Sequence, residues 1–356
     1  MKFYTLQVEY IIVGQGICGS FLSYYLTKKN ISHIVIDEAK ENSASKVASG
    51  VINPITGRRF VRTWMIEEVM PFAVNAYKNF EKEFQCSLID QTNIIDFHTT
   101  PQMKLAFEER LPQETTYLSL LENQNQFDNY FNNPLGAGEI HPCWLIDVNI
   151  FLNIYREKLI VNKALIKECF DAEQLKLESE FIFYKDIKAK KIIFCDGVNG
   201  ANSPWFKLLP YAPNKGEALI VEINDLPRNN IYKTNMSFVP WQDNSFWVGS
   251  SYEWKFEHPN PTELFRQKTE TCLSQWLKIP FKTIEHLASV RPANIERRPF
   301  VGFHPIHNQI GILNGMGTKG CSLAPYFANE LVEHLNGNST INKNVNIKRF
   351  DKILSK

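Results

Sequence analysis

Residues 8–19 read VEYIIVGQGICG, and SFLSYYLTKK follows them directly. The run VEYIIV is apolar and rich in β-branched residues, which is typical of a buried parallel strand. From Ile17 to Lys29 the apolar residues recur at helical spacing. The glycines Gly14, Gly16 and Gly19 lie between the two patterns or at the helix start. The stretch therefore predicts a strand, a glycine-rich turn and a helix.

Each glycine has a physical role in such a turn when a dinucleotide binds there. Gly14 permits the tight turn, Gly16 lets the backbone approach a pyrophosphate, and Gly19 allows the helix to pack against the sheet. The free N–H groups at the helix N-terminus favour phosphate. Glycines are scarce, since there are 17 in 356 residues, and seven of them fall within residues 14–19 and 311–320. We predict a dinucleotide site at the first of these windows.

A second strand-like run, HIVIDE at residues 33–38, ends in Asp37 and Glu38. A carboxylate at this distance from the glycines accepts hydrogen bonds from an adenosine ribose. Without this role the two acids are solvated residues after a strand, and the glycines form only a turn. No basic residue adjoins them, which favours a free 2′-hydroxyl and makes NADP the least expected dinucleotide.

The loop ENSASKVASGVINPITGRR, residues 41–59, replaces the further strand and helix units that a nicotinamide dehydrogenase would usually have next. Its small residues would let an extended cofactor lie across the loop, whereas the alternative is an ordinary surface loop. Arg58 and Arg59 either bind a carboxylate or phosphate or face water.

The rest of the chain alternates strand-like and helix-like segments, and IGILNGMGTKGCSLAPYFANELVEHL at residues 310–335 repeats the order of strand, glycine-rich turn and helix. An exposed excursion is expected at the polar residues 122–134. The other predicted segments are helices at 65–84, 149–159 and 261–278, strands at 92–98, 164–170, 181–186 and 190–197, and antiparallel strands within 216–252.

Composition excludes several classes of protein. The length of 356 residues suggests two domains, and 44% hydrophobic residues suffice for a core. A net charge of +1 indicates neither a disordered acidic chain nor a uniformly basic nucleic-acid surface. The seven cysteines are scattered without CxxC spacing, and no HxxxH pair occurs. We expect a soluble cytoplasmic protein with no metal site and no membrane span.

Four segments, taken in order, resemble the D-amino-acid oxidase (DAO) family of FAD-dependent oxidoreductases, which includes glycine oxidase and sarcosine oxidase. They are VGQGICGS with Asp37, SASKVASG, IIFCDGVNG and NGMGTKGCSLAP. The resemblance implies an α/β fold with a glutathione-reductase-like Rossmann domain for FAD at residues 1–70, 145–212 and 288–356. It implies a mostly antiparallel substrate domain at residues 71–144 and 213–287.

In this family a hydride passes from the carbon beside an amine to flavin N5, and oxygen or another acceptor reoxidises the flavin. The substrate implied is a small amine or amino acid. The expected cofactor-binding residues are Gly14, Gly16, Gly19, Asp37, Glu38, Ser45, Lys46, Ala48, Ser49, Gly50, Asp196, Gly197, Gly315, Met316, Gly317, Thr318, Lys319 and Gly320.

The resemblance also implies three residues around the reacting atoms. Arg291 matches an arginine that clamps the substrate carboxylate, and its alternative is a structural salt bridge. Lys319 matches a position near flavin N1, where a cation stabilises the reduced flavin, and otherwise it is a solvated lysine. Tyr252 matches a tyrosine of the substrate site or is a core aromatic. Arg297 and Arg298 precede a proline and are expected to be structural.

Two departures from the family pattern affect the cofactor. The segment RPANIERRPFVG, residues 291–302, lacks the cysteine that tethers FAD in sarcosine oxidases. We therefore expect non-covalent FAD. Asp196 stands where the family often has a small residue or threonine.

Two alternative functions remain open. The terminal motif, with ASGVINP, also resembles the FAD half of the enzyme that matures carboxymethylaminomethyl-uridine in tRNA. The methyltransferase domain usually fused to that half has no counterpart in this sequence. The near-neutral net charge also gives no general attraction for the phosphates of tRNA. The other alternative is a non-catalytic FAD-binding protein.

Overall fold

The computed structural model describes residues 6–356 and divides into two compact units. Unit 1 consists of Met1–Ala48, Val148–Asn214 and Val290–Lys356, of which residues 1–5 lie outside the described part. Unit 2 consists of Ser49–Asp147 and Lys215–Ser289. Each unit contains one large sheet with helices, so the predicted α/β class is confirmed.

The division differs from the predicted boundaries mainly at residues 49–70, which belong to unit 2 and not to the first domain. Backbone pairing explains the difference, because β3 (Val51–Ile52) is antiparallel to β10 (Trp144–Ile146). Just before β3, the carbonyl of Gly50 accepts a 3.0 Å hydrogen bond from the N–H of Ile146.

The sheet of unit 1 has the order β11-β2-β1-β14-β13-β12, with β21 beside β14 and β20 beside β21. The strands β11, β2, β1, β14 and β21 run parallel, whereas β12, β13 and β20 form antiparallel pairs at the margins. The bounds are β1 Leu6–Val13, β2 His33–Ile36, β11 Leu165–Ile166, β12 Leu175–Leu177, β13 Ile182–Tyr184, β14 Ile187–Phe194, β20 Phe300–Phe303 and β21 Ile310–Asn314.

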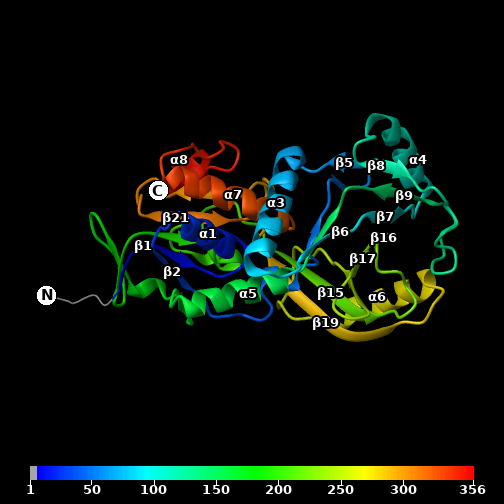
Figure 1. The fold of residues 1–356 in the computed structure, drawn as a ribbon, viewed down its shortest axis with the longest axis horizontal. Coiled ribbons are helices and arrows are strands. Elements are labelled where there is room, and N and C mark those ends of the chain that lie inside the picture. Colours follow the sequence, from blue (N-terminus) through cyan, green and yellow to red (C-terminus); the bar gives the residue numbers. More distant parts are fainter. Residues whose placement is uncertain (1–5) are drawn as a thin grey trace. The chain divides into compact units, whose positions relative to one another are not determined.

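Helix α1 (Ile17–Lys28) is buried on nearly every side and packs against both α5 (Val148–Val161) and α7 (Gly320–Leu335) (Figure 1). The rings of Phe21 and Phe151 stack at 4.6 Å between α1 and α5. This burial explains why apolar and small residues lie on nearly every side of α1 and polar exposed residues come only in its last turn. The smaller helices of unit 1 are α2 (Ala44–Val47) and α8 (Asp351–Leu354), with 3₁₀ turns η2 (Ala172–Gln174), η3 (Gly197–Asn202) and η4 (Ile347–Phe350).

Unit 2 is built on an eight-stranded, mostly antiparallel sheet with the order β19-β15-β18-β17-β16-β7-β9-β8. One face of this sheet packs its aromatic and aliphatic side chains against α6 (Glu263–Trp276). The bounds are β7 Ile94–Phe97, β8 Leu118–Leu120, β9 Ala137–Ile140, β15 Asn214–Glu222, β16 Ile231–Lys233, β17 Ser237–Pro240, β18 Ser245–Gly249 and β19 Lys282–Arg291.

Shorter elements complete unit 2. Strand β10 also pairs with β6 (Ile89–Gln91), and β4 (Ile55–Thr56) pairs with β5 (Val61–Arg62). The helices are α3 (Ile66–Phe84) and α4 (Pro101–Arg110), which continues into the 3₁₀ turn η1 (Leu111–Gln113). The predicted long helix at residues 65–84 is therefore present almost to the residue.

The excursion predicted at residues 122–134 is only partly exposed, and the expectation is wrong at its aromatic positions. Phe127 and Phe131 are buried in the core beneath the sheet. The ring of Phe131 stacks on Trp276 of α6 at 4.2 Å, and Asn132 and Lys278 extend this contact through backbone hydrogen bonds. The polar residues around them face outward, so the polar composition of the segment did not indicate these two core residues.

Candidate dinucleotide-binding site

The turn between β1 and α1 brings three backbone segments together where no side chain fits. Gly14 has a φ of +97°, and a Cβ there would lie 2.6 Å from the carbonyl oxygen of Cys195, just after β14. A Cβ on Gly19 would lie 1.9 Å from the carbonyl oxygen of Gly14. Real Cβ atoms do not approach backbone oxygen this closely. The structure thus supplies a steric reason for both glycines.

The N-terminus of α1 faces the loop that carries Ser45. Gly16 is the N-cap residue and offers no side chain to the first turn, which contains no acidic residue. The N–H of Ile17 donates to Ser45 Oγ at 3.1 Å. The positive end of the helix dipole is therefore free of nearby carboxylates on the helix itself, as binding of an anion requires.

Asp37, just past β2, accepts three hydrogen bonds. Its Oδ2 accepts from the N–H of Gln15 at 2.8 Å, and its Oδ1 accepts from the N–H of Ala39 at 2.8 Å and from Arg156 Nη1 at 2.7 Å. Arg156 Nη1 also donates to Gln15 Oε1 at 2.8 Å. Glu38, in contrast, is exposed. One ion pair therefore links the glycine turn, β2 and α5.

Arg156 corrects the sequence argument about the dinucleotide. That argument disfavoured NADP because no basic residue adjoins Asp37, yet the fold places an arginine against it from 119 positions away. Nothing local in the sequence signals this pairing. A nearby arginine is compatible with a 2′-phosphate. The lack of a basic residue next to Asp37 in the sequence therefore does not decide which dinucleotide binds.

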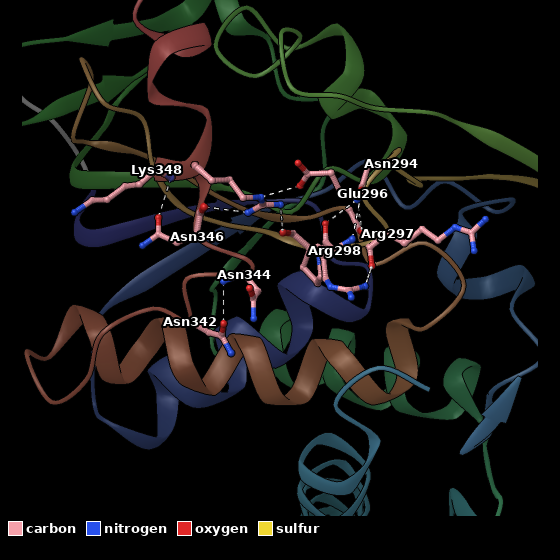
Figure 2. Close-up of polar contacts among 11 residues, drawn as sticks. Asn294, Glu296, Arg297, Arg298, Asn342, Asn344, Asn346 and Lys348 are labelled. Carbon is pink, nitrogen blue, oxygen red and sulfur yellow. Dashed lines mark hydrogen bonds and ion pairs between the residues drawn. The ribbon is translucent and has the colours of Figure 1, made fainter. Parts of the chain in front are cut away.

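The second glycine-rich turn joins β21 to α7. Gly315 and Gly317 have φ values of +76° and +58°, and Lys319 is the N-cap residue of α7. Asn294 supports the turn, since its Nδ2 donates to the carbonyl oxygen of Gly315 at 3.0 Å. The same Nδ2 donates to the carbonyl oxygen of Arg298 at 2.8 Å (Figure 2). The predicted order of strand, turn and helix is confirmed here, and Asn294 is a supporting residue that the sequence did not reveal.

Positive charge gathers near Lys319. Burial, together with the neighbouring charges of Arg298 and Arg297, lowers the pKa of Lys319 to about 8. Arg298 Nη1 donates to the carbonyl oxygen of Arg297, and Arg349 forms an ion pair with Glu296 at 2.9 Å (Figure 2). Lys319 is half-buried, so it is not the fully solvated lysine of the alternative interpretation.

Arg291, at the end of β19, donates from Nη1 to Asn214 Oδ1 at 2.7 Å. Asn214 is buried, so this bond fixes one side of the guanidinium. Tyr252 belongs to unit 2 and is 61% exposed, which makes the core-aromatic interpretation wrong.

Other predicted residues have separate structural roles. Gly50 has a φ of +82°, and a Cβ there would lie 2.0 Å from the carbonyl oxygen of Ile146, so backbone packing in unit 2 already requires glycine. The backbone carbonyl of Lys46 accepts a hydrogen bond from Asn149 Nδ2 at 3.2 Å. Ala48 is the C-cap residue of α2, and Ser49 follows it. In the second glycine-rich turn, Met316 is buried and Thr318 is exposed.

Within residues 6–356, no helix is both long and apolar enough to cross a bilayer. The same residues contain no group of three or more His, Cys, Asp or Glu side chains placed to hold a metal ion.

Replacing Arg156 with methionine tests the ion pair. The variant leaves the Asp37 carboxylate, whose side chain is 18% exposed, without its cation, so we expect it to lower the free energy of unfolding by about 1–3 kcal/mol. Lys158→Met removes an exposed cation from the same helix and should change stability by less than about 0.5 kcal/mol. Denaturant unfolding of both apoproteins measures the difference, and equal stabilities would contradict the assigned role.

Comparison with known proteins agrees with this geometry. The family model of FAD dependent oxidoreductases (DAO) matches residues 9–334. Glycine oxidase of Bacillus subtilis (strain 168) is 24% identical over 349 residues, covering 89% of this chain and 90% of that protein.

Two solved structures share the fold. Glycine oxidase from Geobacillus kaustophilus superimposes with a TM-score of 0.80 at 13% identity, covering 94% of this chain and 96% of that one. Iminodiacetate oxidase from Chelativorans sp. BNC1 gives a TM-score of 0.74 at 16% identity, with 96% and 98% covered. Both glycine-rich turns are in place and the family model matches residues 9–334, so this chain belongs to the DAO family of FAD-dependent oxidoreductases.

Proposed function

We propose that this protein oxidises the C–N bond of a small amine or amino acid that carries a carboxylate. The observation that carries the proposal is Arg291, whose guanidinium is fixed on one side by Asn214 at the end of β19. A planar guanidinium held in this way suits two parallel hydrogen bonds to a carboxylate. The relatives named above include oxidases of glycine and iminodiacetate, which both bear a carboxylate beside the amine.

Different residues of unit 1 would bind different parts of FAD, which would accept the hydride when bound. The backbone around Gly16 and the N-terminus of α1 would take the pyrophosphate, and Asp37 would take the ribose hydroxyls. Lys319 at the start of α7 would place a cation where negative charge develops during the reaction. Because no cysteine lies in residues 291–302, we propose that the cofactor is bound without a covalent link.

An anaerobic absorbance titration of the FAD-loaded protein tests this function. The panel is glycine, sarcosine, proline, D-amino acids and N-substituted glycines, and we expect at least one to bleach the flavin band, because hydride transfer reduces the flavin. Chemical reduction with dithionite is the control for a reducible cofactor. If dithionite bleaches the flavin but no member of the panel does, the result would contradict a small carboxylate-bearing amine as the substrate.

Arg291→Ala tests the carboxylate clamp. Loss of a charge-assisted pair with the substrate should raise KM about tenfold to a hundredfold, while FAD binding stays unchanged. The control is Arg266→Ala, which removes an exposed arginine paired with Glu270 on α6. The methyl ester of the substrate, which has no carboxylate, should react equally with wild type and the Arg291 variant. An unchanged KM for the acid would assign Arg291 a structural role.

A further inference from the structure

Asp196 lies at the centre of the carboxyl edge of the unit 1 sheet. It comes two residues after β14, whose last residue Phe194 pairs with Val13 of β1 on one side and Ile312 of β21 on the other. A Cβ on Gly14 would lie 3.3 Å from the Cα of Asp196. The carboxyl group therefore belongs to the same edge as the glycine turn, where open α/β sheets bind their ligands.

The hydrogen-bond partners of Asp196 are neutral. Its Oδ1 accepts from Asn314 Nδ2 at 2.9 Å, and the same amide donates to the carbonyl oxygen of Gly197 at 2.8 Å. Within residues 6–356, no lysine or arginine forms an ion pair with Asp196. An ionised carboxylate here would thus be held by a neutral amide and its own backbone, without a balancing charge.

An unsatisfied hydroxyl lies in the same place. The Tyr211 hydroxyl is buried, and no residue in the described part of the chain hydrogen-bonds to it. A Cβ on Gly200 would lie 2.3 Å from this oxygen and 2.9 Å from Asn314 Nδ2, so the hydroxyl and the amide lie over the same glycine. Among the described residues, this edge of the sheet therefore carries the Asp196 carboxyl without an ion-pair partner and the Tyr211 hydroxyl without a hydrogen bond. Both are features of a binding site for a polar ligand.

The titratable groups that face Asp196 do not supply charge. They are Cys195, which precedes it in the chain, and Tyr211 before β15; Cys18 on α1 in turn lies near Cys195. Burial raises the pKa of Cys18 to about 12 and the pKa values of Cys195 and Tyr211 well above their usual ranges. All three are neutral near pH 7. Burial likewise raises the pKa of Asp196 to about 7, against the opposing hydrogen bonds from Asn314 and the backbone.

We propose that Asp196 binds the pyrophosphate of FAD as the neutral acid, donating its O–H hydrogen bond to a phosphate oxygen. This inference rests on the FAD dependence of the family and not on the identity of the substrate. A carboxylate would repel the doubly charged pyrophosphate, whereas a carboxylic acid offers a hydrogen-bond donor at the sheet edge that carries Gly14. No covalent bond forms or breaks, and the proton stays on Asp196.

The role has a measurable consequence because binding then requires a proton on Asp196. Below about pH 7 the acid is already protonated and affinity should not depend on pH. Above that value FAD must bind together with a proton, so Kd should rise about tenfold per pH unit. Lys319 also loses charge near pH 8, and it is a second source of pH dependence for the flavin end of the cofactor.

The test uses apoprotein from which FAD has been removed, with ADP as the main probe between pH 6 and pH 9. ADP contains the pyrophosphate but no flavin, so it reports Asp196 without the proposed contact of Lys319. In wild type we expect the Kd of ADP, measured by competition with FAD fluorescence quenching, to rise about a hundredfold between pH 7 and pH 9. Asp196→Asn should bind ADP with a flat profile, since an amide donates at every pH.

Two further variants keep the test decisive. Asp196→Ser also retains a donor and should be flat, which covers the case of an Asn variant that fails to fold. Glu180→Gln removes an exposed carboxylate from unit 1 and should keep the wild-type profile. A flat wild-type profile, or a slope that survives in both Asp196 variants, overturns the inference. An apoprotein that binds FAD at no pH would overturn the cofactor assignment together with it.

Discussion

The structure of unit 1 depends on a contact between backbones that have no side chains between them. Gly14 lies against the end of β14, and Gly19 in turn lies against Gly14, so β1, α1 and β14 meet at one point. Any Cβ at either position would displace the helix from the sheet. Because α1 also contacts α5 and α7, this contact sets the position of the other helices of the unit.

Charge is arranged around that contact in a way that suits a long, doubly charged cofactor. No acidic residue lies in the first turn of α1, and the acid at the end of β2 is paired with Arg156. At the other glycine-rich turn, Lys319 precedes α7 among arginines. The unit therefore offers helix N-termini and cations along one edge. Asp196 lies at the same edge, and burial raises its pKa to about 7.

Local patterns predicted much of this fold. The strand, turn and helix at residues 8–28 and 310–335 follow from periodicity and glycine placement, which depend on neighbouring residues only. The contacts that the sequence concealed are non-local. Arg156 reaches Asp37 across 119 positions, Gly50 is required by a carbonyl in β10, and Phe131 is a core residue inside a polar segment. The ionisation of Asp196 depends on burial, which no local pattern encodes.

The central claim is that the two glycine contacts form the FAD site of this oxidoreductase. Calorimetric titration of the apoprotein with FAD, in wild type and in Gly19→Ala, tests it most directly. We expect one FAD per chain in wild type and no measurable binding in the variant, because the methyl group would displace the turn from α1. A Gly19→Ala protein that binds FAD as tightly as wild type would contradict the account.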